Sequence, residues 1–125
     1  MKKELLDSIR LNSGAELKNR ILMAPMTIQA GYFDGSVTSE MIDYYQFRSG
    51  DAAAIIVESC FVEDHGRGFP GAIGVDSDEK IEGLAKLAEG IKEKGSKAIL
   101  QIYHAGRMAN PKLNAGEQPI SASPI

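Results

Sequence analysis

Polar side chains that could do chemistry follow three apolar segments of the sequence, at the point where each segment ends. They carry hydroxyl, carboxyl, thiol, amide, imidazole and guanidinium groups. The residues are Thr27, Gln29, Glu58, Ser59, Cys60, Gln101, His104 and Arg107. In parallel α/β proteins, ligands bind at the carboxyl ends of the strands. We therefore expect these side chains to gather at one edge of a sheet and to line a ligand site.

Each candidate also has a purely structural interpretation. A nucleophilic Cys60 needs an adjacent base, whereas a lone cysteine is commonly a small buried hydrophobe. Glu58 is either a catalytic carboxyl or a cap for neighbouring backbone N–H groups, and the sequence leaves both open. His65 and His104 lack the spacing of a metal-ligand pair, so no metal site is predicted. Gln101 interrupts an apolar strand, and a buried amide needs partners that a ligand could supply.

Three continuous apolar runs predict the strands that position these side chains. They cover residues 21–24, 52–57 and 98–103, and their lack of alternation is typical of strands in a parallel sheet. Between them, helical patterns are expected over residues 38–49 and 76–94. The apolar positions expected on these helices are Met41, Ile42, Tyr45, Phe47, Ile81, Leu84, Ala85, Ala88 and Ile91.

The order of these elements predicts the fold class. Residues 8–18 form a predicted hairpin, and a β-α-β-α-β unit follows it. Helices that alternate with buried strands are typical of right-handed parallel crossovers, so the predicted class is α/β. We divide the chain into an N-terminal hairpin part, 1–18, a β-α-β-α-β part, 19–104, and a loop, 105–125.

The composition is that of a globular domain and argues against several classes of protein. The chain has 125 residues, 43% of them apolar and 25% charged, which argues against disorder. A net charge of −3 without a Lys/Arg cluster argues against nucleic-acid binding. No apolar run approaches the roughly 20 residues that a membrane span needs. The single cysteine and the polar N-terminus predict a cytoplasmic protein without a signal peptide.

Three segments together resemble the old yellow enzyme family of NADH:flavin oxidoreductases, or FMN-dependent ene-reductases. They are residues 17–27 (LKNRILMAPMT), 54–59 (AIIVES) and 101–107 (QIYHAGR), and the closing residues 119–125 (PISASPI) fit as well. The order and spacing of the segments match, and the resemblance covers nearly the whole chain. It implies that the chain is the N-terminal part of a (β/α)8 TIM barrel.

The resemblance also implies an FMN site at the mouth of that barrel. The residues that would border or bind the flavin are Ala24, Pro25, Met26, Thr27, Ser59 and Gln101. The Thr27 side chain would lie near the N5/O4 edge of the flavin, Ser59 beneath the ring, and Gln101 at its polar edge. The residues that would contact substrate are Gln29, His104 and Arg107; the alternative for residues 104–107 is that they shape the mouth of the barrel or a subunit contact. Several relatives have a tyrosine at the position of Gln29, and no residue of the chain is assigned as catalytic.

The implied reaction is a ping-pong hydride transfer. NADH or NADPH reduces FMN, and reduced FMN then reduces the activated C=C bond of a small enone-type substrate. A (β/α)8 barrel needs about 250 residues, so this chain would be an incomplete, inactive segment that binds FMN weakly or not at all. Its exposed sheet edges would favour self-association. Two other interpretations stay open: a non-catalytic α/β binding or assembly module, and a segment of a dienoyl-CoA-reductase-like iron–sulfur flavoenzyme.

Overall fold

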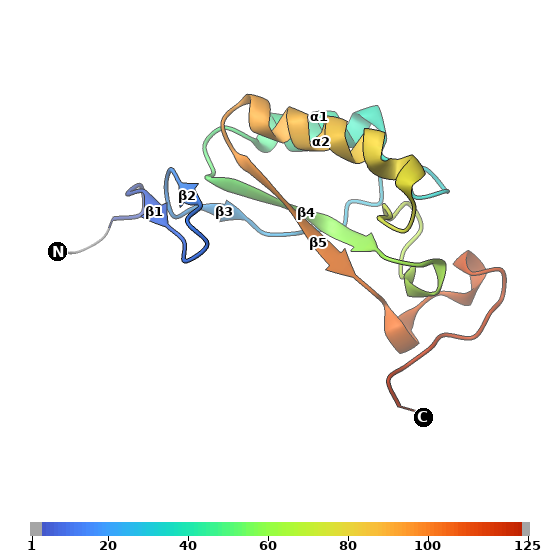
Figure 1. The fold of residues 1–125 in the computed structure, drawn as a ribbon. Coiled ribbons are helices and arrows are strands. Elements are labelled where there is room, and N and C mark those ends of the chain that lie inside the picture. Colours follow the sequence, from blue (N-terminus) through green and yellow to red (C-terminus); the bar gives the residue numbers. More distant parts are fainter. Residues whose placement is uncertain (1–3, 124–125) are drawn as a thin grey trace.

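A three-stranded parallel sheet carries both α-helices on one of its faces (Figure 1). The computed structural model describes residues 4–123. The strands are β3 (Leu22–Met23), β4 (Ala54–Phe61) and β5 (Lys97–Tyr103), and β4 lies in the centre. Both neighbours of β4 are parallel to it, so the carboxyl ends of all three strands lie at the same edge of the sheet.

The two helices form the connections between these strands. Helix α1 (Ser39–Arg48) connects β3 to β4, and α2 (Ile81–Glu93) connects β4 to β5. The hydroxyl of Thr38 caps α1 by accepting a hydrogen bond from the backbone N–H of Met41 at 3.2 Å. A short 3-10 turn, η2 (Asp78–Lys80), precedes α2. The observed order is therefore the predicted β-α-β-α-β order.

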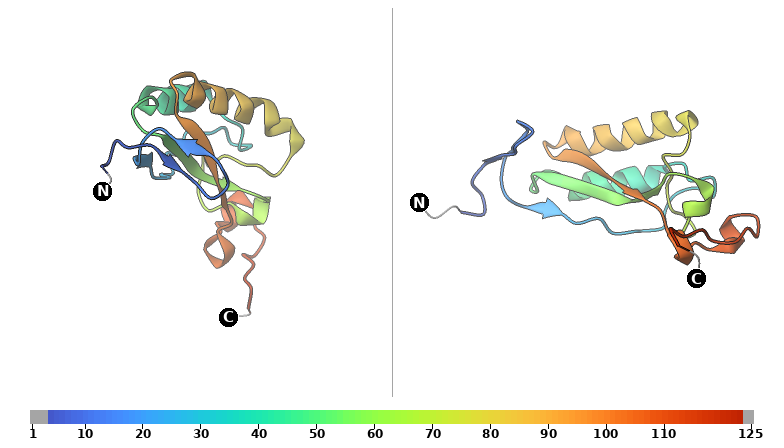
Figure 2. Two further views of the ribbon diagram at one scale, coloured as in Figure 1. Left: turned by 60° about the vertical axis from the view of Figure 1, so that its left-hand side comes forward. Right: turned by 60° about the horizontal axis from the view of Figure 1, so that its bottom comes forward.

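The predicted hairpin is present at the amino ends of the strands. Strands β1 (Ile9–Arg10) and β2 (Glu16–Leu17) pair antiparallel, and Gly14 adopts a φ of 86° in the turn between them. Leu17 is buried against the start of β4. Residues 104–123 lie at the opposite, carboxyl end of the sheet (Figure 2), where they include the 3-10 turns η3 (Gly106–Met108) and η4 (Pro111–Leu113).

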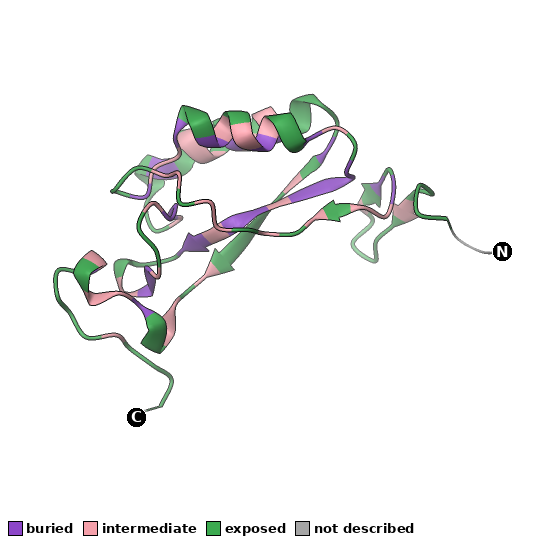
Figure 3. Ribbon diagram, turned by 180° about the vertical axis from the view of Figure 1, so that it is seen from behind, coloured by how far each residue is buried: buried purple, intermediate pink, exposed green. Residues whose placement is uncertain are grey.

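The main core lies between the helices and the sheet. Strand β4 is buried along most of its length (Figure 3). The buried members of this core are Met41, Tyr45, Ala52, Ile55, Val57, Cys60, Ile73, Leu87 and Ile91. Burying a large aliphatic or aromatic side chain contributes about 1.5–3 kcal/mol. Among residues 4–123, no helix is long and apolar enough to span a bilayer.

Three of the apolar helix positions were predicted wrongly. Phe47 is 80% exposed, Ile81 is 59% exposed, and Ala85 is also exposed. Met41 and Tyr45 are one turn apart and define the buried face of α1, and Phe47 lies about 200° around the helix from Tyr45. On α2 the buried positions are Ile91 and Leu87, and Leu87 was not among the predicted positions.

The predicted strands also differ from the observed ones. Strand β3 has only two residues, and Leu22 is 43% exposed although burial on both faces was predicted. The reason is that Ile21 and Met23 pack against the core beneath the helices, so Leu22 between them points to the sheet face that carries no helix (Figure 1). Strand β4 continues to Phe61, so Glu58, Ser59 and Cys60 lie within the strand and not beyond its end.

Candidate functional site

A register shift in β4 decides which side chains reach the uncovered face of the sheet. Val57 pairs with Leu100 and Ser59 pairs with Gln101, so Glu58 is an extra residue that β5 does not match. Such a bulge changes the alternation of side chains and re-aims those that follow. Val57 and Leu100 line a small cavity beneath α2. Beyond the bulge, Cys60 is again buried in the core, so Ser59 and Gln101 lie on the opposite face.

Ser59 and Gln101 form the polar pair of this uncovered face. The Ser59 hydroxyl donates to Oε1 of Gln101 at 3.1 Å. Because the amide oxygen is occupied in this way, the NH2 group of Gln101 is left as a donor for a ligand. Ser59 is half-buried and Gln101 is exposed. The structure therefore brings together two of the six residues that the resemblance assigns to flavin.

The other four predicted flavin residues form the extended segment 24–27 after β3. Ala24 and Met26 are exposed, whereas Pro25 and Thr27 are half-buried. This segment belongs to the strand on the other side of β4, so β4 lies between it and Gln101. Immediately beyond it, Gln29 has a φ of 57°, in the left-handed region.

Glu58 of β4 forms hydrogen bonds both with the chain that follows this segment and with α1. Its Oε2 accepts a hydrogen bond from the backbone N–H of Ile28 at 3.1 Å. The Tyr45 hydroxyl donates to the same oxygen at 3.4 Å and accepts from the backbone N–H of Glu58 at 2.9 Å. The side chain of Glu58 is fully buried, and burial raises its pKa, an effect that the bond from Ile28 opposes. Of the two interpretations of Glu58, these contacts support the cap of a backbone N–H.

The free energy of unfolding of the wild-type protein is expected to fall as pH rises through the titration of Glu58. Replacing Glu58 by glutamine should make this fall smaller. At pH 4.5, the ordinary carboxyl pKa, the wild-type side chain is about half ionised in the unfolded chain and more neutral in the folded state. As pH rises through the raised pKa of the folded state, ionisation favours the unfolded chain, so wild type loses stability. Urea denaturation at pH 4.5 and at about pH 8 measures this loss. The free energy of unfolding of Glu58→Gln relative to wild type should grow with pH, and a constant difference would contradict the assignment.

Cys60 is a buried hydrophobe and not an activated nucleophile. It is fully buried, and its thiol donates to the carbonyl oxygen of Glu58 at 3.1 Å. Burial raises the pKa of the thiol to about 12, so almost no thiolate exists at neutral pH.

His104 and Arg107, predicted as substrate contacts, lie beyond the end of β5. His104 Nε2 pairs with Glu63 at 2.9 Å, and its Nδ1 accepts from the backbone N–H of Gly106 at 2.8 Å. Both ring nitrogens therefore bind the surrounding loops. Arg107 is exposed in η3. Contact of Gln29, His104 and Arg107 with substrate stays a prediction.

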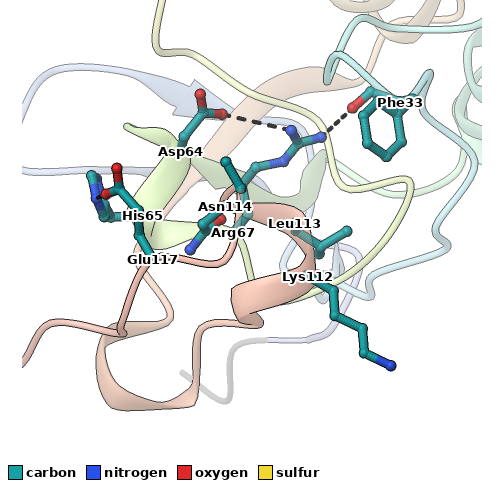
Figure 4. A pocket seen from close by; sticks show the side chains of 9 residues that line it. Phe33, Asp64, His65, Arg67, Lys112, Leu113, Asn114 and Glu117 are labelled. Atoms are coloured by element: carbon teal, nitrogen blue, oxygen red, sulfur yellow. Dashed lines mark hydrogen bonds and ion pairs between the residues drawn. The ribbon is translucent and has the colours of Figure 1, made fainter.

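A cavity of about 500 Å³ lies among the loops at the carboxyl end of the sheet (Figure 4). None of the predicted flavin residues lines it. Its charged groups largely bind one another: His65 pairs with Glu117, and Arg67 lies 3.6 Å from Asp64. Arg67 also donates to the backbone oxygen of Phe33. Most charged side chains that line this cavity are therefore already paired with other residues of the chain. Within the described part of the chain, no cluster of three or more potential metal-ligating side chains occurs.

Comparison with known proteins identifies the family. Residues 4–125 match the sequence profile of the NADH:flavin oxidoreductase / NADH oxidase family. The chain belongs to this family. Within it, the chain is 69% identical over 122 residues to the NADH:acrylate oxidoreductase of Vibrio harveyi. It is also 61% identical over 121 residues to the NADH:fumarate oxidoreductase of Klebsiella pneumoniae. These matches cover 98% and 97% of the chain but only 12% and 13% of the two relatives.

Solved structures of the family have the same fold. The old yellow enzyme homologue from Zymomonas mobilis matches 97% of the chain with a TM-score of 0.88 and 32% identity, and morphinone reductase matches 99% with a TM-score of 0.86 and 27% identity. The chain spans about a third of each of these structures and about an eighth of the two curated relatives. The old yellow enzyme resemblance and the part-barrel α/β fold class are therefore confirmed.

Proposed function

We propose that this chain supplies the flavin-binding surface of an NAD(P)H-oxidising flavoenzyme, with FMN lying against Ser59, Gln101 and residues 24–27. The observation that carries the proposal is the Ser59–Gln101 pair on the uncovered face near the carboxyl ends of the strands. Ligands of parallel α/β folds bind at this end.

The residues present fit a flavin. An isoalloxazine ring needs an apolar support and a few fixed hydrogen-bond donors at its polar edge. Ala24 and Met26 supply exposed apolar surface beside the half-buried Thr27. The amide NH2 of Gln101 supplies a donor whose orientation the bond from Ser59 restrains. In this arrangement the chain binds and orients the flavin.

When bound, FMN would supply the redox chemistry, accepting a hydride from NADH or NADPH and passing it to an acceptor. The chain's own contribution is binding and orientation, and none of its residues is proposed as a proton donor. The proposed acceptor is the activated C=C bond of a small molecule, as in ene-reductases.

The names of the relatives bear on the acceptor. Acrylate and fumarate are both activated alkenes, which supports alkene reduction. Because the chain covers only 12% and 13% of the two relatives, the named substrate need not react at this part of them. NAD(P)H is the reductant in several other relatives, including an NADH oxidase of Thermoanaerobacter brockii and an NADPH dehydrogenase of Bacillus subtilis. We therefore place NAD(P)H oxidation by FMN first and alkene reduction second. The cytoplasmic location and the self-association of residues 1–125 stay predictions.

Replacing Gln101 by alanine is expected to weaken FMN binding about tenfold. The variant removes one hydrogen bond to the flavin and the partner of Ser59, and a lost bond of about 1–1.5 kcal/mol corresponds to roughly this factor. Titration of flavin fluorescence with the full-length protein measures the dissociation constant. Gln118→Ala, at an exposed position in the C-terminal segment, is the matched control and should bind as wild type does. Equal affinity of Gln101→Ala and wild type, or a wild-type protein that binds no FMN, would overturn the proposal.

A further inference from the structure

Glu58 occupies an unusual position for a carboxyl group. It is the extra residue of the β4 bulge, and its side chain is fully buried on the helix side of the sheet. Oε2 accepts from Ile28 N–H at 3.1 Å and from the Tyr45 hydroxyl at 3.4 Å, whereas Oε1 has no hydrogen-bond partner among residues 4–123. A buried charged oxygen without a partner is costly, so the contacts favour the neutral carboxylic acid. In that form one oxygen accepts from Ile28 as a carbonyl does.

The hydrogen bond from the Ile28 N–H to Glu58 lies between two residues that matter for the proposed site. Ile28 stands between Thr27, which the proposed function places beside the flavin, and Gln29, whose φ of 57° is uncommon for a residue other than glycine. Such a conformation persists only where the surroundings hold it. One holding contact is the bond to Glu58, and another is the hydroxyl of Thr38, which donates to the carbonyl oxygen of Ala30 at 2.7 Å.

We propose that Glu58 is a positioning residue for the flavin: through the backbone N–H of Ile28 it holds Thr27 at the place where the ring binds. This inference rests on the proposed function. The bulge makes the arrangement possible, because the same extra residue that sends Ser59 to the flavin face leaves Glu58 on the helix side, within reach of Ile28. The bulge in β4 thus places Ser59 on the flavin face and, through Glu58, also positions the segment that contains Thr27.

Two substitutions of Glu58 with side chains of similar volume distinguish its role as a hydrogen-bond acceptor from its role in filling space. Glu58→Gln keeps a carbonyl oxygen for Ile28 and resembles the neutral acid. Glu58→Met fills the same space without an acceptor, and as a buried apolar residue it should leave the protein folded. Tyr45→Phe is the control for general loss of stability. It removes the hydroxyl that accepts from Glu58 N–H and donates to Oε2 at 3.4 Å, but it leaves Oε2 in place as the acceptor for Ile28.

The experiment has two readouts in the full-length protein. Hydrogen exchange of the Ile28 amide, followed by NMR without flavin, reports the bond itself. It should become at least tenfold faster in Glu58→Met and stay near the wild-type rate in Glu58→Gln and Tyr45→Phe. Flavin binding should weaken about tenfold in Glu58→Met, with a displaced visible absorption band, and recover in Glu58→Gln.

The possible failures are distinguishable. If Glu58→Met binds flavin with the wild-type affinity and spectrum, the inference is overturned while the proposed function stands. Equal losses in Glu58→Met and Tyr45→Phe would also overturn it, because they would indicate a general structural role. A wild-type protein that binds no flavin would overturn the proposed function and this inference together.

Discussion

Replacing Phe61 by alanine is expected to lower the free energy of unfolding by about 3–5 kcal/mol. The ring is fully buried at the end of β4. It packs so closely on two glycines that a Cβ atom at Gly35 or at Gly74 would lie 2.6 Å from its Cζ atom. The cationic groups of Arg67 and Lys80 each lie 4.8 Å from the ring centroid. Alanine would leave a cavity among rigid backbone segments that cannot close over it, and urea denaturation measures the loss.

Phe47→Ala is the matched control for this substitution. Phe47 is 80% exposed on α1, so its removal should change stability by no more than about 0.5 kcal/mol. If the two variants lose similar stability, Phe61 does not have the packing described above.

The second large effect is expected for Gly71→Ala, which should lower the free energy of unfolding by about 2–5 kcal/mol. Gly71 has a φ of 69°, a conformation that costs about 1–2 kcal/mol for other residues. A Cβ atom there would also collide with the carbonyl oxygen of Gln29 and lie 2.7 Å from its carbonyl carbon. These are backbone atoms that cannot rotate away, and forced overpacking costs about 1–3 kcal/mol. Thermal and urea denaturation measure the total.

Gly116→Ala separates the two causes. Gly116 has a similar φ of 87°, but a Cβ atom at this position would have no neighbour within 4 Å among residues 4–123, so only the backbone cost of about 1–2 kcal/mol should appear. A Gly71 variant that loses no more stability than the Gly116 variant would show that the contact with Gln29 is absent. Because Gln29 adjoins the proposed flavin segment, Gly71→Ala should also weaken flavin binding, and Gly116→Ala should not.

Local signals were sufficient to predict most of the secondary structure. The cap of α1 depends on the hydroxyl of Thr38 and on the backbone N–H of Met41, three residues later, so a short stretch of sequence contains it. The end of the same helix depends on Gly50, which adopts a φ of 113°. The apolar run over residues 52–57 was visible because β4 is buried nearly throughout, whereas most of the apolar run that forms β5 is exposed.

The site was only partly predictable from the sequence. The family resemblance pointed to Ser59 and Gln101, and the structure pairs them across neighbouring strands. The bulge at Glu58 left no recognisable signal, because a bulge is a mismatch between two strands and neither strand contains it alone. The role of Glu58 stayed undecided for the same reason: its partner Ile28 lies 30 residues earlier in the chain.

By itself, the sequence determined the α/β class, the order of the elements and the family, because these depend on local periodicity, on caps and on contiguous motifs. Only the tertiary structure decided which face of each element is buried and where each polar side chain points. Phe47 is exposed and Leu87 is buried because of what packs against the two helices. Ser59 reaches the open face because one extra residue in β4 shifts its register against β5. Both outcomes depend on contacts between segments far apart in the chain, which no local pattern encodes.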